Sequence, residues 1–125
     1  MKVLLNMLGS PGLDLKGMMI ELLVLLAING GVVTRGPSVD HPNAVDVSCV
    51  VGEPVYAVSN GHIHTSWSYR TGNTVELHTE AHRYLYGHLQ SIRVPAGLVS
   101  ERTVIGTCGN TGAYTTGPHL HFERL

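Results

Sequence analysis

The stretch Gly117-Pro118-His119-Leu120-His121-Phe122-Glu123 places two histidines two residues apart in an apolar run. Residues two apart on a β-strand point to the same face, so His119 and His121 are expected to project together. A pair of imidazoles on one strand face can share a metal site, or it can supply one ligand and one acid/base group. Because a catalytic zinc ion takes three protein ligands, further ligands are expected from other parts of the chain.

Short strands and frequent turns are predicted between this motif and Gly31. Val, Thr, Tyr and Ile are common there. Strands are predicted over residues 45–50, 55–58, 62–68, 74–78, 83–89, 104–108 and 120–123. Asn60-Gly61 is a strong hairpin signal, and Thr79-Glu80-Ala81 is predicted to join the two strands of another hairpin. The pattern is typical of a mostly β domain built on an antiparallel sheet.

Residues 13–28 form the one predicted α-helix, and Asn29-Gly30-Gly31 supplies a stop signal after it. Apolar residues nearly encircle this helix, which indicates that it docks on the rest of the domain, on another copy or on another protein. The apolar run 18–28 contains Glu21 and is shorter than the roughly 20 residues that span a bilayer, so a membrane role is not expected. Residues 3–5 are too short an apolar run for a clean signal peptide.

The composition is that of a single globular domain. The 125 residues suffice for one domain but hardly for two, and 43% of them are hydrophobic against 14% charged. The net charge of −1 does not indicate the excess of basic residues that nucleic-acid binding requires, so no nucleic-acid partner is expected. Eight histidines are a high number for this length and direct attention to metal binding.

Cys49 and Cys108 are the two cysteines. A disulfide between them and a pair of small buried thiols are equally compatible with the sequence, because their distance in space is not readable from it. Neither has another cysteine close by, which excludes a four-cysteine zinc knuckle.

Three further residues are candidates to join the C-terminal histidines. His41 and Asp46 lie where the first β-strand begins, so a loop histidine and a strand carboxylate can converge on one ion. His88 lies at the end of a predicted strand. Of the nearby tyrosines, Tyr86 is expected to pack and Tyr114, in a polar loop, is expected to line a groove.

Taken in order, these motifs resemble the lysostaphin-type zinc endopeptidases, a family of peptidoglycan hydrolases. The resemblance covers about residues 35–125 and is specific because many separate motifs occur in one order. They are His41…Asp46, Gly52-Glu53-Pro54-Val55-Tyr56-Ala57, Asn60-Gly61, Gly72-Asn73-Thr74-Val75, Tyr86-Gly87-His88-Leu89, Val104-Ile105-Gly106, Gly109-Asn110-Thr111-Gly112 and the C-terminal motif 117–123. We therefore divide the chain into an N-terminal apolar helical segment, residues 1–31, and a lysostaphin-type peptidase domain, residues 32–125.

The resemblance implies roles for five residues. His41, Asp46 and His121 match the zinc ligands of the family, and His88 and His119 match two catalytic histidines that contact the reacting water or the oxyanion. One feature departs from the family: four residues, rather than the usual three, separate the first histidine from the aspartate. A loop can accommodate a single insertion, and the spacing from Asp46 to Gly52 is normal for the family, so His41 is kept as the expected ligand.

The implied function is hydrolysis of peptide bonds in the stem or cross-bridge of bacterial peptidoglycan, outside the cytoplasmic membrane. Three origins would reconcile this location with the lack of a clean signal peptide: a fragment of a longer exported protein, a phage lysin, or a phage-virion component that digests the wall. The alternative is a catalytically weak or inactive module of the same fold. Such a module would be a structural or wall-binding part of a larger assembly, such as a phage tail, docked through residues 13–28.

Four other histidines are not expected to join the site. His62 and His64 repeat the two-residue spacing of the C-terminal pair, but they lack the Gly-Pro lead-in and are expected on an exposed strand face. His78 and His82 flank a predicted turn and are expected in solvent. Trp67 is expected to pack rather than to bind sugar.

Overall fold

The computed structural model describes residues 15–39 and 41–125. Within them lie one α-helix and ten β-strands. The helix is α2 (Leu15–Ala27), and the strands are β1 (Val33–Arg35), β2 (Ala44–Ser48), β3 (Pro54–Tyr56), β4 (Gly61–Ser68), β5 (Gly72–His78), β6 (Arg83–Leu89), β7 (Ser91–Ile92), β8 (Gly97–Val99), β9 (Val104–Thr107) and β10 (His119–Arg124).

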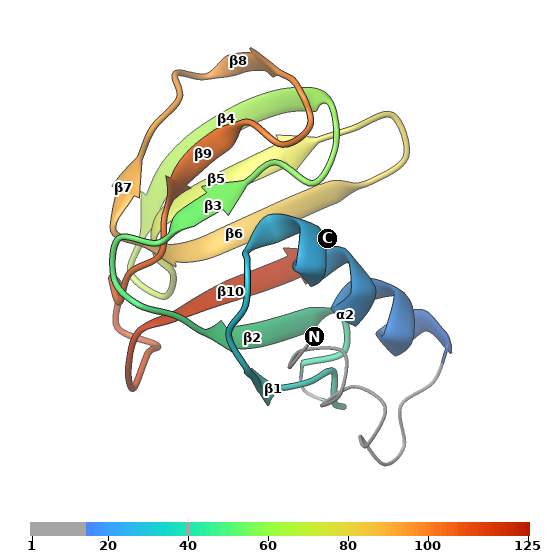
Figure 1. Cartoon of the computed structure of the whole chain (residues 1–125), viewed down its shortest axis with the longest axis vertical. Coiled ribbons are helices and arrows are strands. Elements are labelled where there is room, and N and C mark those ends of the chain that lie inside the picture. Colours follow the sequence, from blue (N-terminus) through green and yellow to red (C-terminus); the bar gives the residue numbers. More distant parts are fainter. Residues whose placement is uncertain (1–14, 40) are drawn as a thin grey trace.

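The strands form two antiparallel sheets. The larger sheet has the order β1-β2-β10-β6-β5-β4-β8, and the smaller has the order β3-β9-β7. The smaller sheet and α2 lie on the same face of the larger sheet (Figure 1), where α2 contacts β2, β10 and β3. This arrangement confirms the prediction of a mostly antiparallel β domain with one N-terminal α-helix.

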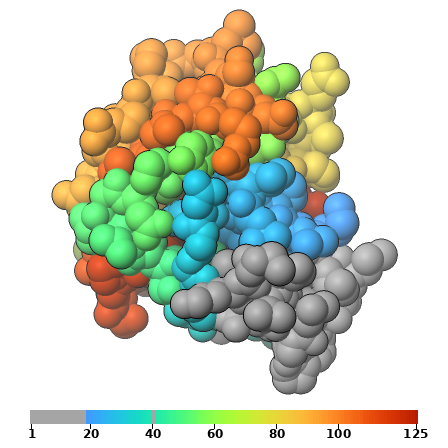
Figure 2. Space-filling model, in the orientation of Figure 1, coloured from blue at the N-terminus to red at the C-terminus, as the bar shows by residue number. Residues whose placement is uncertain are grey.

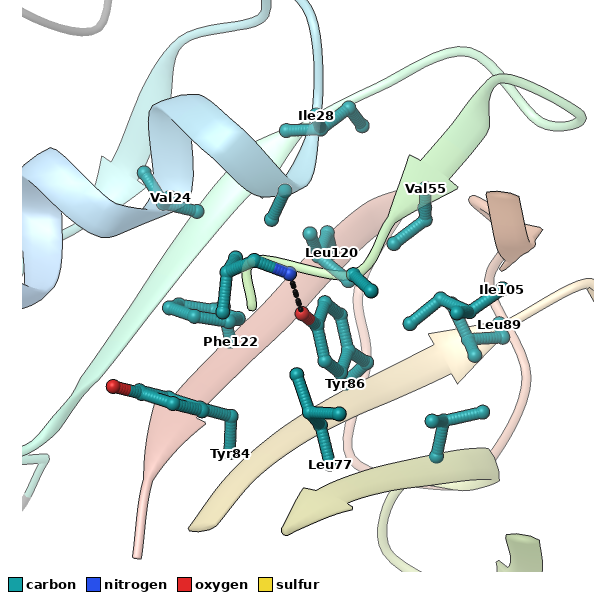
Figure 3. Packing of buried hydrophobic residues seen from close by; sticks show 14 of the residues in the cluster. Val24, Ile28, Val55, Leu77, Tyr84, Tyr86, Leu89, Ile105, Leu120 and Phe122 are labelled. Atoms are coloured by element: carbon teal, nitrogen blue, oxygen red, sulfur yellow. Dashed lines mark hydrogen bonds between the residues drawn. The ribbon is translucent and has the colours of Figure 1, made fainter. Parts of the chain in front are cut away.

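The core lies between the larger sheet and the layer formed by α2 and the smaller sheet. Alternate strand residues point into it, and Leu120, Phe122, Tyr84 and Tyr86 are buried in this way. The Tyr86 hydroxyl accepts a hydrogen bond from the Val58 N–H at 3.0 Å, which satisfies its polar end inside the core (Figure 3). Tyr86 therefore packs, as predicted, and the opposite face of the larger sheet carries the polar residues of the site.

Helix α2 packs on this core through one side. Ile20, Val24 and Ala27 are buried and repeat at helical spacing, whereas Met19, Leu22 and Leu26 remain 41–49% exposed. Figure 2 shows residues of α2 at the surface of the molecule. No helix in the described part of the chain is long and apolar enough to cross a bilayer.

The predicted helix over 13–28 is confirmed for residues 15–27. Residues 13 and 14, and the apolar run 3–5, lie outside the described residues. Because α2 shares one core with the strands, it is an integral part of the described fold. The division of the chain after residue 31 stays a prediction.

One predicted hairpin is wrong. β3 pairs with β9, and β4 pairs with β5 and β8, so Asn60-Gly61 connects strands of different sheets. Gly61 is required for another reason, because a Cβ atom there would collide with the His78 carbonyl oxygen on the adjacent strand. The Asn60 side-chain oxygen accepts a hydrogen bond from the Glu101 N–H at 2.8 Å and so ties this connection to the loop before β9.

Other differences from the sequence predictions are small. The hairpin of β5 and β6 forms with His78 paired to Arg83, as expected. β1, β7 and β8 were not predicted, since two or three residues are too few to show an alternating pattern. Trp67 was expected to pack but is 62% exposed near the end of β4, so that prediction is wrong.

A disulfide joins Cys49, just after β2, to Cys108, just after β9. The two Cα atoms are 6.4 Å apart, and the bond closes a loop with a sequence separation of 59. Of the two alternatives that the sequence left open, a disulfide and a pair of buried thiols, the structure has the disulfide. The bond ties the larger sheet to the smaller one next to the loop 109–117, which leads into β10.

Candidate metal centre

His121 and Asp46 are direct cross-strand neighbours on the open face of the larger sheet. β10 and β2 pair antiparallel with His121 opposite Asp46. Their flanking residues Val45, Val47, Leu120 and Phe122 point into the core, so the alternation of both strands turns the two polar side chains outward. The Nδ1 atom of His121 lies 2.9 Å from Oδ1 of Asp46.

His41 reaches the same point from the loop before β2. Its backbone pairs with Ser38 through two hydrogen bonds of 3.0 and 3.1 Å, which close a tight hairpin. Pro42 and Asn43 then form a turn into β2, and His41 reaches the site although four residues separate it from Asp46. The His41 Nε2 atom lies 3.4 Å from Nδ1 of His121 and 3.8 Å from Oδ1 of Asp46.

The His41, Asp46 and His121 atoms form a triangle that fits a zinc ion. Its sides are 2.9, 3.4 and 3.8 Å. Tetrahedral zinc with bonds of about 2.0–2.1 Å holds its ligand atoms about 3.4 Å apart, in the middle of this range. Two imidazole nitrogens and one carboxylate oxygen are a donor set typical of catalytic zinc, which keeps a fourth position open. In the described part of the chain, no other three His, Cys, Asp or Glu side chains bring their ligand atoms within 4.8 Å of one another.

Glu123 lies two residues beyond His121 and contacts the other side of its ring. His121 Nε2 is 3.0 Å from Glu123 Oε1. Although burial disfavours the imidazolium, the hydrogen bonds to Asp46 and Glu123 raise the pKa of His121 to about 9. The hydrogen bond from His121 in turn lowers the pKa of Glu123. If a metal ion were to displace the proton from Nδ1 of His121, Glu123 could still hold the proton on Nε2.

Asp46 is placed to stay ionised. Burial alone would raise its pKa, but the hydrogen bond and the charge of His121 outweigh that effect and lower the pKa of the Asp46 carboxyl. His41 is the opposite case, because burial lowers the pKa of its imidazole. A neutral imidazole and an ionised carboxylate are the forms in which these side chains bind metal.

His88 reaches the site through an irregularity in β6. Strand alternation alone would send His88 into the core, the side to which Tyr84 and Tyr86 point. However, Asn73 pairs with Leu89 and Val75 with Tyr86, so β6 carries one residue more than β5 in this interval. His88 has a φ of 61°, in the left-handed region, and this β-bulge turns its side chain to the cleft.

The ring of His88 is fixed in one orientation. It is 2% exposed, and its Nδ1 atom lies 2.6 Å from the Thr111 carbonyl oxygen, to which Nδ1–H donates. Burial lowers the pKa of His88 despite this hydrogen bond. The ring is therefore neutral at neutral pH, with Nε2 available as a proton acceptor.

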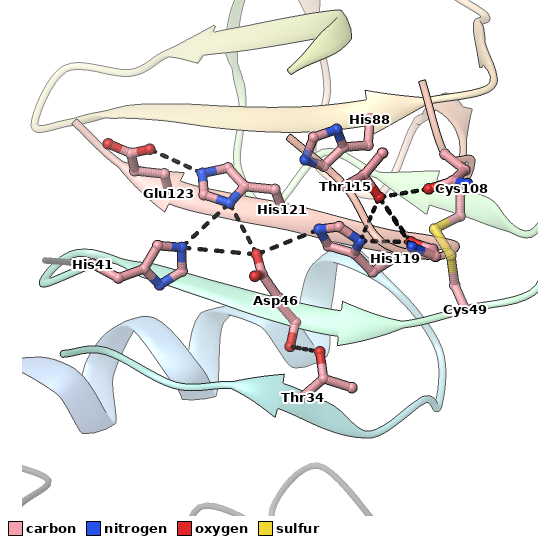
Figure 4. A network of polar contacts seen from close by, with 12 residues as sticks. Thr34, His41, Asp46, Cys49, His88, Cys108, Thr115, His119, His121 and Glu123 are labelled. Atoms are coloured by element: carbon pink, nitrogen blue, oxygen red, sulfur yellow. Dashed lines mark hydrogen bonds and ion pairs between the residues drawn. A yellow bond between two sulfur atoms is a disulfide. The ribbon is translucent and has the colours of Figure 1, made fainter. Parts of the chain in front are cut away.

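His119 lies on β10, two residues before His121 (Figure 4). Its Nδ1 atom lies 2.8 Å from the Gly117 carbonyl oxygen, so Nδ1–H donates there and Nε2 faces Asp46 Oδ1 at 3.8 Å. The ring centroids of His88 and His119 are 4.6 Å apart. Two imidazoles anchored through Nδ1 thus present their Nε2 sides beside the His-Asp-His triangle.

All five residues singled out in the sequence line one cleft of about 480 Å³. Tyr114 lines it as well, as predicted. Glu123 and Arg70 are among the lining residues that had no predicted role. The strand period of two connects Glu123 to His121 and is a signal in the sequence. No local pattern marks Arg70, because only the folding of its loop brings it to the cleft.

The other histidines stay apart from this cleft. His62 and His64 are exposed on β4, as predicted. His82 is exposed, but His78 is only half-buried: its ring lies 4.0 Å from that of His64, and its Nε2 is 3.0 Å from Oε1 of Glu76.

Comparison with known proteins agrees with this geometry. Residues 40–125 match Peptidase family M23. The chain is 39% identical over 105 residues to glycyl-glycine endopeptidase ALE-1 of Staphylococcus capitis, covering 80% of this chain and 26% of that protein. It is 39% identical over 83 residues to peptidoglycan DD-endopeptidase ShyC of Vibrio cholerae, covering 64% of this chain and 19% of that protein.

Among solved structures, a zinc containing peptidase from Vibrio cholerae matches with a TM-score of 0.62 at 33% sequence identity. The match covers 78% of this chain and 32% of that one. The chain thus spans about a quarter or less of the length of the two curated relatives. It belongs to peptidase family M23, a family of zinc peptidases, and its His-Asp-His cluster fits that metal.

Proposed function

We propose that the protein is a zinc-dependent endopeptidase that hydrolyses peptide bonds in bacterial peptidoglycan. The observation that carries the proposal is the His-Asp-His triangle with two oriented histidines beside it, in one cleft of an M23 chain. The names of two relatives, a glycyl-glycine endopeptidase and a peptidoglycan DD-endopeptidase, support a cell-wall substrate.

In this proposal His41, Asp46 and His121 hold the zinc ion. Zinc at a site with an open position supplies Lewis-acid chemistry, polarising the scissile carbonyl and making water acidic. His88 and His119 are the catalytic histidines. One accepts a proton from the attacking water through Nε2. The Nε2–H formed in this way then donates a hydrogen bond to the oxyanion and passes its proton to the leaving amine.

The setting of this activity is outside the cytoplasmic membrane, at the bacterial wall. A phage lysin or a wall-digesting component of a virion fits the proposed substrate. We also propose that residues 13–28 dock the peptidase on a larger assembly. The support is the exposed apolar side of α2, formed by Met19, Leu22 and Leu26.

The same apolar side favours a second candidate, a weak or inactive module that serves as a structural part of such an assembly. The two candidates differ in turnover. The test is to measure bound zinc in the purified chain and to follow the release of peptides from walls of several bacterial species, with and without a chelator.

The proposed enzyme should release peptide, lose that activity with chelator and regain it with added zinc. His119→Ala should reduce the rate by at least about 100-fold while retaining zinc. His62→Ala is the matched control, since His62 has the same two-residue spacing but lies outside the cleft. Bound zinc without turnover on any wall would favour the inactive module.

A further inference from the structure

Arg70 stands in the wall of the same cleft, on the short connection after β4. This connection is fastened to the loop 109–117 by backbone hydrogen bonds. The Ala113 N–H donates to the Tyr69 carbonyl at 2.8 Å, and the Tyr114 N–H donates to the Arg70 carbonyl at 3.2 Å. Arg70 and Tyr114 therefore belong to two loops that are joined into one wall.

The side chain of Arg70 is held over the ring of Tyr114. Its guanidinium carbon lies 4.8 Å from the ring centroid, a cation–π contact, and Tyr69 packs edge-on against the same ring. This contact holds the guanidinium beside the ring without using a hydrogen bond from its N–H groups. Within residues 15–39 and 41–125, Arg70 forms no ion pair with a carboxylate.

The acidic side chains of the cleft contact histidines, although, besides the hydrogen bond from His121, the charge of Arg70 also helps to lower the pKa of Glu123. Asp46 contacts three histidines, and Glu123 accepts a hydrogen bond from His121. Arg35 and Arg70 are the arginines that line the cleft. A bound Zn²⁺ ion would add positive charge to the cleft that Arg70 lines, which would attract an anionic substrate. A neutral glycine bridge has no carboxylate with which the Arg70 guanidinium could form an ion pair.

We propose that Arg70 is a specificity-determining residue that pairs with a carboxylate of the substrate peptide close to the scissile bond. This inference rests on the proposed endopeptidase function and narrows its substrate class to crosslinks that carry a free carboxylate. A planar guanidinium binds a carboxylate through two parallel hydrogen bonds, a geometry that lysine does not reproduce.

The test uses two synthetic stem-peptide dimers with the same scissile amide. In the first, the residue beside that amide carries a free carboxylate, and in the second the carboxylate is amidated. Binding of both dimers to the zinc-loaded protein is measured by calorimetry in the His119→Ala background, so that the dimers are not consumed. Arg70→Gln should weaken binding of the carboxylate dimer by about 10- to 100-fold and leave the amidated dimer within about twofold.

Two further variants sharpen the result. Arg70→Lys keeps the charge but should recover only part of the affinity, because it loses the paired hydrogen bonds. Arg102→Gln is the matched control: Arg102 also lies over a tyrosine, 4.5 Å from the ring centroid of Tyr56, but outside the cleft. It should bind both dimers like the parent protein.

Turnover by the protein with His119 intact is measured separately with the same dimers. Arg70→Gln should raise KM for the carboxylate dimer with little change in kcat, as expected when binding is lost equally in ground state and transition state. Equal binding of the two dimers by the parent protein, or equal weakening of both by Arg70→Gln, would overturn the role of Arg70. Failure to cleave any dimer would contradict the endopeptidase function, whereas the binding comparison would still decide the role of Arg70.

Discussion

The Nε2 atom of His121 lies 3.0 Å from Oε1 of Glu123, on the side of the imidazole ring away from Asp46. This contact fixes the ring with Nε2 protonated and leaves Nδ1 for the metal. Replacing Glu123 by Ala should therefore weaken zinc binding by about 10- to 100-fold, measured by competition with a chromogenic chelator. Glu123→Gln keeps an acceptor oxygen and should lose less. Unchanged zinc affinity in Glu123→Ala would contradict this role.

Glu21 is fully buried in α2, and neither carboxylate oxygen has a hydrogen-bond partner among residues 15–39 and 41–125. Burial raises its pKa above the ordinary value of 4.5, so the ionised form opposes folding. The contribution of Glu21 to stability is most favourable below pH 4.5 and is lost as the pH rises through its raised pKa. Glu21→Gln should therefore be more stable than the parent protein at pH 8, by about 1–2 kcal/mol.

The measurement is urea unfolding of both proteins, metal-free, at several values between pH 4 and pH 8. The advantage of the Gln variant should shrink as the pH falls, because the parent carboxyl then takes up a proton. Stability curves that run parallel across this range would show that Glu21 has the same pKa in the folded and unfolded chains.

The Cys49–Cys108 disulfide should contribute strongly to stability. Closing a loop with a sequence separation of 59 limits the unfolded chain and is worth about 4 kcal/mol in the chain-entropy description. Reduction with dithiothreitol should lower the free energy of unfolding by an amount of this order, as should Cys49→Ser combined with Cys108→Ser. The double variant is also the control, since dithiothreitol should not destabilise it further.

Two substitutions of His88 can distinguish the stability cost of its left-handed backbone from the chemical role of its imidazole. Asn adopts a positive φ more readily than other residues with a Cβ, so His88→Asn should be more stable than His88→Ala by a few tenths to about 1 kcal/mol. Both variants lack the imidazole and should lose peptidase activity to a similar extent. Thermal unfolding and wall-peptide release measured on the same samples check both statements. A more stable Ala variant would argue against backbone strain at this position.

The sequence by itself determined the local features of this protein. Strand alternation put His119 and His121 on one face and predicted most of the strands, because a period of two is a property of the extended backbone. The apolar run with its glycine stop gave the helix in the same way. The ordered motifs gave the family, which the match over residues 40–125 confirms.

Only the tertiary structure decided how these pieces meet. The pairing of β2 with β10 sets Asp46 opposite His121, and the turn at Pro42 and Asn43 brings His41 to them despite the longer spacing. The bulge in β6 turns His88 from the core to the cleft, against the alternation that the sequence predicts. The hairpin predicted at Asn60-Gly61 was wrong because Gly61 is required by the close approach of a neighbouring strand rather than by a tight turn. Distances between residues remote in sequence depend on strand register and loop path, and neither has a local signature.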